Sequence, residues 1–174
     1  MTDDEALDRI RARLDGARSS LEAAAARDEA LAEYVPAQRR LLVFTKEAVM
    51  VPRGRVWRLG VFLLGRDGTL YQTGSLTRRQ APGRPAYQSV SAEERRAYRA
   101  AAFRGHFAEG ESVNYGAHEI ALEAESLRSS TGPLFLRDGE ALVRWSSTAP
   151  DAVVEFGRYL DDRVGLLTNP PAGT

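Results

Sequence analysis

The chain contains no cysteine among its 174 residues. This absence excludes disulfide bonds, thiolate metal ligands and a cysteine nucleophile. Long apolar runs are missing too, because stretches such as residues 61–64 are far shorter than the ~20 residues that a membrane-spanning helix needs. The N-terminal residues 2–5 are acidic where a secretory signal would be basic and then apolar. We therefore expect a cytoplasmic protein without a membrane partner.

Lysine is almost absent, since 23 of the 24 basic residues are arginine and the other is Lys46. A genome rich in G and C favours arginine codons and is the simpler explanation. The alternative is functional, because arginine offers a planar, bidentate donor that matches carboxylate and phosphate groups. The 43% of hydrophobic and 28% of charged residues are typical of a globular protein. The length predicts a single domain over residues 1–174.

Familiar catalytic motifs are missing as well. The sequence has no Gly-x-Ser-x-Gly, no Ser-x-x-Lys, no Walker loop and no Gly-x-Gly-x-x-Gly. The serine nucleophiles and nucleotide sites that depend on these motifs are therefore unsupported. We expect no cofactor.

The N-terminal residues predict a long helix, a helical arm over residues 1–36. Apolar side chains recur there every three or four residues, as one narrow stripe of a helix requires. The stripe consists of Leu7, Ile10, Leu14, Ala17, Leu21, Ala24, Leu31 and Val35. Because an alanine-rich stripe allows close approach, a homodimer through this helix is one expectation.

Residues 40–145 change to a period of two, which is typical of a sheet. Asp67-Gly68 and Asp138-Gly139 indicate tight hairpins, because these residue types tolerate the positive φ of such turns. We also predict a hairpin with its reversal at residues 45–47 and one central strand over residues 56–64. Together these segments predict an antiparallel sheet of about five or six strands.

Two further helices are predicted around this sheet. Ser91 and the glutamates that follow it form a capping box, which opens a helix over residues 91–104 that Gly105 ends in a left-handed conformation. A C-terminal helix over residues 150–167 begins near Pro150, since proline costs least in a first helical turn. The fold class is therefore α+β.

Charge is distributed unevenly along the chain. The net charge is −2 over residues 1–51, +8 over residues 52–104 and −6 over residues 105–174. Segments of opposite sign could lie against one another within the fold or across a homodimer, which is the simpler interpretation. The alternative is a basic surface that attracts an anionic ligand.

Residues 106–119 hold both histidines of the chain. Histidine titrates near neutral pH, and a neighbouring carboxylate makes it a general base or a metal ligand. We therefore take His106, His118, Glu109 and Glu111 as candidate catalytic residues, with a Ser112–His118 pair across the fold as an alternative. The spacing matches no zinc signature such as H-E-x-x-H, so we predict no metal site. A structural or solvent-exposed role of these side chains is the simpler interpretation.

An arginine cluster offers the second candidate site. Arg95 and Arg99 lie one turn apart on the predicted helix, where like charges repel, so a counter-charge should lie nearby. Ion pairs within or between subunits are the simpler interpretation. If no carboxylate of the protein supplies the counter-charge, an anion could bind there, together with Arg78, Arg79 and Arg84.

Three stretches carry a resemblance to a known group of proteins. They are Trp-Arg-Leu-Gly-Val at residues 57–61, the segments 100–105 and 107–111, and the tail over residues 159–173. These stretches resemble small bacterial proteins that are labelled glutaminase, and the resemblance implies amide hydrolysis. Serine-dependent glutaminases use a Ser-x-x-Lys nucleophile, which is missing here, so the resemblance assigns no catalytic residue.

Two functional hypotheses follow. The first is a binding or interaction domain whose arginine-rich surface over residues 78–104 meets an anionic small molecule or an acidic protein surface. The second is a small-molecule amide hydrolase that uses residues 106–119. We expect no nucleic-acid partner, because the net charge is zero and the isoelectric point is near neutral.

Overall fold

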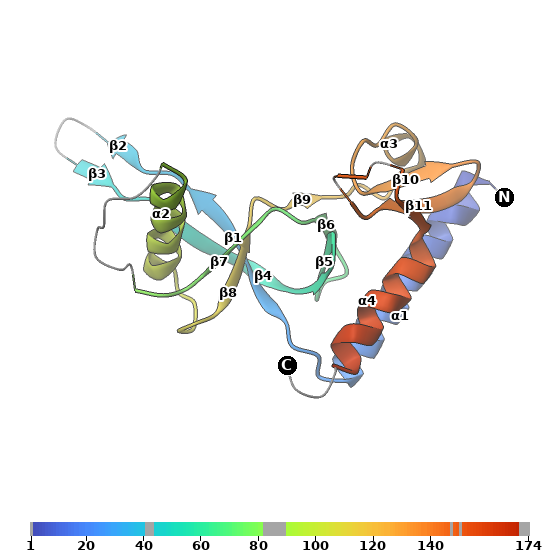
Figure 1. The fold of residues 1–174 in the computed structure, drawn as a ribbon, viewed down its shortest axis with the longest axis horizontal. Helices are drawn as coiled ribbons and strands as arrows, with labels where there is room; N and C mark the ends of the chain where they lie inside the picture. The colour runs from blue at the N-terminus through green and yellow to red at the C-terminus, as the bar shows by residue number, and fades with distance from the viewer. Residues whose placement is uncertain (1, 41–43, 82–89, 147, 150, 171–174) are drawn as a thin grey trace. The chain divides into compact units, whose positions relative to one another are not determined.

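The computed structural model describes residues 2–40, 44–81, 90–146, 148–149 and 151–170 (Figure 1). These residues divide into two compact units, and each unit has a hydrophobic core of its own. The first unit combines residues 1–28, 57–73 and 118–174, and the second combines residues 29–56 and 74–117. The chain crosses repeatedly between these two units, and the single domain over residues 1–174 stays a prediction.

The first unit is built from helices and short strands. Its elements are α1 (Asp3–Ala23), β5 (Phe62–Gly65), β6 (Leu70–Gln72), β9 (His118–Glu119), α3 (Ala124–Arg128), β10 (Leu134–Arg137), β11 (Glu140–Arg144), β12 (Val153–Glu155) and α4 (Phe156–Thr168). The last three strands pair antiparallel in the order β10-β11-β12. Helices α1 and α4 lie side by side (Figure 1) and enclose the core together with these strands.

The second unit is a sheet that is covered by one helix. Its elements are β1 (Glu29–Val35), β2 (Gln38–Arg40), β3 (Phe44–Lys46), β7 (Ser75–Arg78), α2 (Val90–Arg104), β8 (Ser112–Tyr115) and the first part of β4 (Val49–Leu59). The strand order is β7-β8-β1-β4 in this unit and β4-β5-β6-β9 in the first, so that seven strands follow one another. Because β1 and β8 run parallel, the sheet is mixed and larger than we predicted. The α+β class is confirmed.

Helix α1 follows its predicted stripe only as far as Leu21. Thr2 and Glu5 form a reciprocal capping box, in which each side chain accepts a hydrogen bond from the other residue's backbone amide. The helix stops where Ala25 adopts a φ of 47° and the Ala26 amide donates to the Leu21 carbonyl at 2.9 Å. The prediction of a helical arm to residue 36 is wrong, because residues 29–35 pair with β4 and β8 instead.

The apolar stripe of α1 is buried inside the first unit. Its contributing side chains are Ala6, Leu7, Ile10, Leu14, Ala17 and Leu21. The stripe that prompted the homodimer prediction is therefore covered by the unit's own core. None of the helices among the described residues combines the length and the apolar character needed to span a membrane.

Both Asp-Gly hairpins are confirmed. Asp138 and Gly139 have φ angles of 52° and 73° between β10 and β11, as a type I′ turn requires. Between β5 and β6 only Gly68 is left-handed, with a φ of 89°, while the Asp67 carboxylate accepts a hydrogen bond from the Thr69 amide at 3.0 Å. The turn at Asp67-Gly68 is therefore longer than the tight turn that we predicted.

Two other strand predictions are wrong. Residues 44–46 form strand β3, which pairs antiparallel with β2, rather than a turn. Residues 41–43, which we assigned to the preceding strand, lie outside the described part. Residues 56–64 are not one strand, because Gly60 turns the chain with a φ of 68° between β4 and β5. The Tyr159 hydroxyl occupies the space beside Gly60 and accepts a hydrogen bond from the Val61 amide at 3.0 Å.

The C-terminal helix begins later than we predicted. Residues 153–155 form β12 against β11, and α4 starts at Phe156. The Glu155 carboxylate caps α4 by accepting hydrogen bonds from the amides of Gly157 and Arg158 at 2.8 and 2.7 Å. Pro150, to which we assigned the first turn, lies outside the described residues.

Helix α2 lies close to the sheet of the second unit because its inner face carries small side chains. Ala101 and Ala102 are buried against Met50 and other residues of that core. Helix α2 begins at Val90, one residue before the Ser91 at which we predicted its cap. Gly105 lacks the left-handed φ we predicted, but a Cβ there would lie 2.5 Å from the Met50 carbonyl oxygen. Arg95 and Arg99 of the same helix are exposed.

Candidate functional site

The two histidines belong to different units and are both exposed. His106 follows α2 in the second unit, and His118 lies in β9 of the first unit. Neither histidine lines any of the three cavities considered below. The described residues also include no group of three or more side chains that could hold a metal ion. These three cavities therefore lend no support to the predicted histidine chemistry.

The two candidate glutamates near His106 have different surroundings. Glu109 is exposed. The Glu111 carboxylate forms an ion pair with Arg55 and accepts a hydrogen bond from the Ala108 amide at 2.9 Å. These contacts tie the loop after α2 to the sheet, so Glu111 has a structural role. Ser112, the alternative nucleophile, lies in the second unit and His118 in the first.

Three of the five candidate arginines line one cavity in the second unit. Arg95 and Arg99 come from α2, and Arg78 comes from the end of β7. The cavity has a volume of about 250 Å³. Its other lining residues are Leu76, Thr77, Tyr98, Ser112 and Tyr115. We name this the arginine cavity.

The other two candidate arginines are not part of this lining. The guanidinium of Arg79 lies 4.8 Å from the ring centroid of Phe103, which is a cation–π contact. Its backbone is held by the loop after α2, because the Arg79 amide donates to the Glu111 carbonyl at 2.9 Å. Arg84 lies outside the described residues.

Helical spacing and strand register bring the lining residues together. Arg95, Tyr98 and Arg99 follow one another at i, i+3 and i+4, so they share one face of α2. Strand β7 pairs antiparallel with β8, with Arg78 opposite Ser112. The cavity therefore lies where one face of α2 meets the outermost strands of its own unit.

The arginine cavity has no carboxylate to balance its charge. Every aspartate and glutamate of the chain lies among the described residues. None of these carboxylates forms an ion pair with Arg78, Arg95 or Arg99. By contrast, Arg53 pairs with Glu33 in the same unit. The described part of the protein thus lacks the counter-charge that we expected near these arginines.

Three tyrosines form a wall beside the arginines. The ring centroids of Tyr98 and Tyr115 are 4.8 Å apart, and Tyr34 meets Tyr98 edge to face at 5.0 Å. Burial raises the pKa of the Tyr115 hydroxyl above its usual value, although a hydrogen bond with Ser75 acts in the opposite direction. The rings are therefore engaged with one another, and Tyr115 stays a neutral hydroxyl at physiological pH.

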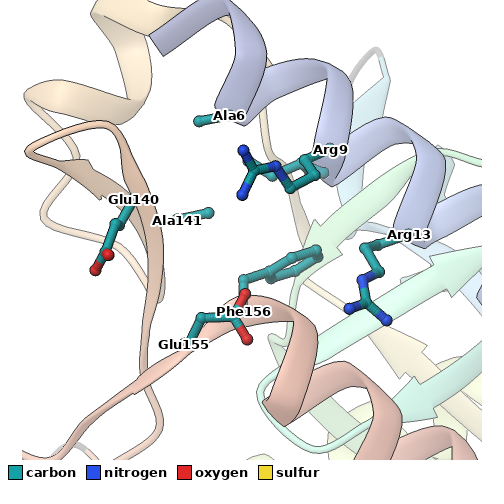
Figure 2. Close-up of a pocket in the computed structure, with 8 residues that line it drawn as sticks. Ala6, Arg9, Arg13, Glu140, Ala141, Glu155 and Phe156 are labelled. Carbon is teal, nitrogen blue, oxygen red and sulfur yellow. The ribbon is translucent and has the colours of Figure 1, made fainter. Parts of the chain in front are cut away.

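A second cavity, of about 240 Å³ in the first unit, is electrically balanced (Figure 2). Arg9 and Arg13 project from α1 on one side, and Glu140 and Glu155 lie on the other, with Phe156 between them. The Arg13 side chain pairs with a neighbouring aspartate of α4 at 3.1 Å. Because Glu155 is also the cap of α4, these charges join the unit's own elements and leave no net charge for a ligand.

A third cavity in the first unit is larger and acidic, with a volume of about 670 Å³. Its charged lining residues are Arg11, Asp15, Asp67, Glu119 and Glu123. Asp67 is engaged with the β5–β6 turn, and Asp15 pairs with Arg18 at 3.6 Å. Acidic residues alone do not define a site, so we assign this cavity no ligand.

The three arginines of the cavity were predicted from the sequence, and Ser112 was named there only as an alternative nucleophile. The other lining residues were not predicted. A signal was present for Tyr98, since it lies between Arg95 and Arg99 on one helical face. Leu76, Thr77 and Tyr115 depend on the β7–β8 pairing, which no local pattern indicated. No protein-family model, curated protein or solved structure matches this chain.

Proposed function

We propose that the second unit is an anion-binding module and that the arginine cavity is its binding site. The observation that supports this proposal is the convergence of Arg78, Arg95 and Arg99 on one cavity without a paired carboxylate. An uncompensated pair of like charges one helical turn apart destabilises a helix by about 0.2–0.5 kcal/mol. A bound anion would reverse this effect, because both guanidinium groups would be attracted to its negative charge.

The chemistry of the lining favours carboxylate or phosphate groups. Guanidinium groups donate two parallel hydrogen bonds to either group, which gives both energy and orientation. Thr77 and Ser112 add hydroxyl groups that can donate to further ligand oxygens. A cavity of about 250 Å³ holds an anionic head group and leaves a larger ligand partly outside.

The charge of the unit as a whole supports the same proposal. Residues 29–56 and 74–117 contain twelve basic and seven acidic side chains, so the unit carries a net charge of +5. A positive field raises the local concentration of anions and speeds their association. The zero net charge of the complete chain conceals this difference.

Calorimetric titration of the full chain with sodium phosphate and with sodium citrate at low ionic strength tests the proposal. We expect binding by the wild-type protein, and at least tenfold weaker binding by each of the single variants Arg95→Gln and Arg99→Gln. Arg96→Gln is the matched control, because it removes the same charge from the same helix at a position that does not line the cavity.

Added sodium chloride should weaken binding, because the interaction depends on charge. Failure of the wild-type protein to bind either anion would contradict the proposal. An equal loss of affinity in the Arg96→Gln control would also contradict it, since the effect would then follow net charge and not the cavity.

A further inference from the structure

Strand β7 lies at the outer edge of its sheet. It is the terminal strand in the order β7-β8-β1-β4, and no described strand pairs with its other side. A free edge presents backbone amides and carbonyls that can pair with another chain. The arginine cavity includes three successive residues of this edge strand, Leu76, Thr77 and Arg78.

The hydrogen-bonding pattern shows which backbone groups of β7 point outward. The Arg79 amide donates to the Glu111 carbonyl at 2.9 Å, which continues the β7–β8 register by one residue. Residues of an antiparallel pair alternate between facing the partner strand and facing away from it. Thr77 therefore directs its backbone groups toward β8, whereas Leu76 and Arg78 direct theirs to the open edge.

Helix α2 lies along this edge strand and supplies the other wall of the cavity. Arg95, Tyr98 and Arg99 face the cavity from the helix, while Leu76 lies on the strand side with 51% of its surface exposed. The result is a groove with a free sheet edge on one side and unpaired positive charge on the other. An exposed apolar side chain lies next to both.

We propose that this groove binds an extended, acidic segment of a partner protein, which adds to β7 as a further antiparallel or parallel strand. The inference rests on the proposed function, because it assigns a polypeptide as the source of the bound anion. Main-chain hydrogen bonds to Leu76 and Arg78 supply the part of the affinity that does not depend on the side chains of the segment. Aspartate or glutamate side chains of the segment pair with the arginines of α2, and alternate apolar side chains pack on Leu76.

Charge complementarity selects this occupant over a neutral strand. A segment with basic side chains would bring like charges together in the groove, which is unfavourable for pairing. A small free anion would engage the arginines but would leave the backbone groups of the edge unused.

Fluorescence anisotropy with short labelled peptides tests the inference on the full-length protein. The first probe is a capped hexapeptide of alternating valine and glutamate. The second has alternating valine and lysine, and the third is the glutamate peptide with N-methyl groups on alternate backbone amides. We expect the glutamate peptide to bind, and the other two to bind at least tenfold more weakly. Equal binding of the N-methylated peptide would overturn strand addition.

Two variants separate this inference from the proposed function. Leu76→Pro removes one outward amide from the edge strand, where proline is tolerated, while Leu76→Ala keeps that amide and removes the apolar side chain. Leu76→Pro should lose peptide binding at least tenfold, a larger factor than its loss of phosphate affinity, whereas Leu76→Ala should lose less peptide binding. Phosphate binding that persists while both Leu76 variants bind the peptide like the wild type would overturn the inference alone.

If the wild-type protein bound neither phosphate nor the peptide, the proposed function itself would be overturned. Sedimentation of the protein without peptide measures its oligomeric state, and so tests whether a second copy of the chain occupies the groove. A dimer that Leu76→Pro abolishes, together with no peptide binding, would identify a second copy of the chain in the groove and overturn the assignment to a partner segment.

Discussion

Replacing Arg99 by glutamine should stabilise the second unit slightly. Arg99 lies four residues after Arg95 and three after Arg96, so it meets two like charges on the surface of α2. Each such pair costs about 0.2–0.5 kcal/mol in an exposed helix. Glutamine and arginine have nearly equal helix propensities, and Arg99 forms no described ion pair that the substitution would break. The expected gain is therefore a few tenths of a kcal/mol, up to about 1 kcal/mol.

The assay must report on the second unit, because the two units have separate cores and need not unfold together. Trp57 and Trp145 both belong to the first unit, so tryptophan fluorescence follows that unit. Near-ultraviolet circular dichroism also includes the packed tyrosines Tyr34, Tyr98 and Tyr115 of the second unit. A transition that appears in this signal and not in tryptophan fluorescence therefore belongs to the second unit. For a unit of this size, a gain of a few tenths of a kcal/mol raises the Tm by about 1–3 °C.

Salt and a second variant complete this test. At 1 M sodium chloride the screening length falls to about 3 Å, so the stability difference between Arg99→Gln and the wild type should largely disappear. Arg104→Gln should have the opposite sign, because the Arg104 side chain donates to the Ala48 carbonyl at 2.8 Å. A loss of 1 kcal/mol or more in Arg99→Gln would refute the reasoning, since it would show that Arg99 has a stabilising partner.

Three further predictions concern local structure. Thr2 lowers the pKa of Glu5 through the capping box. The stability that the Glu5 carboxylate contributes is therefore present above pH 4.5 and is lost as the pH falls through the lowered pKa. Acid titration should show that the stabilities of Glu5→Gln and the wild type converge at low pH. Gly60→Ala should destabilise the first unit by at least about 1–3 kcal/mol in urea unfolding, because its φ is 68° and Tyr159 occupies the adjacent space; an unchanged midpoint would contradict this. Burial raises the pKa of Tyr115. The stability that its neutral hydroxyl contributes is therefore present below pH 10 and is lost as the pH rises through the raised pKa. Alkaline titration followed by absorbance should show that Tyr115→Phe removes a tyrosine that ionises above pH 10.

The arginine cavity could be predicted in part because its helical half is a local pattern. Arg95 and Arg99 are neighbours on any helix over this segment, and the absence of a nearby carboxylate partner could be posed as a question from the sequence. The contribution of Arg78 could not be derived in this way. It depends on β7 pairing with β8, which lies 34–40 residues further along the chain.

The sequence by itself determined the features that arise from neighbours within a few residues. These include the apolar stripe of α1, the two Asp-Gly hairpins, the arginine face of α2 and the α+β class, because helical spacing and turn geometry act over short distances. Tertiary structure decided the features in which distant segments compete with local preference. Residues 29–35 became a strand because β4 and β8 offer hydrogen bonds on both sides. Gly60 turns the chain beside Tyr159, whose hydroxyl bonds to an amide 98 residues away, and no local pattern could indicate that contact.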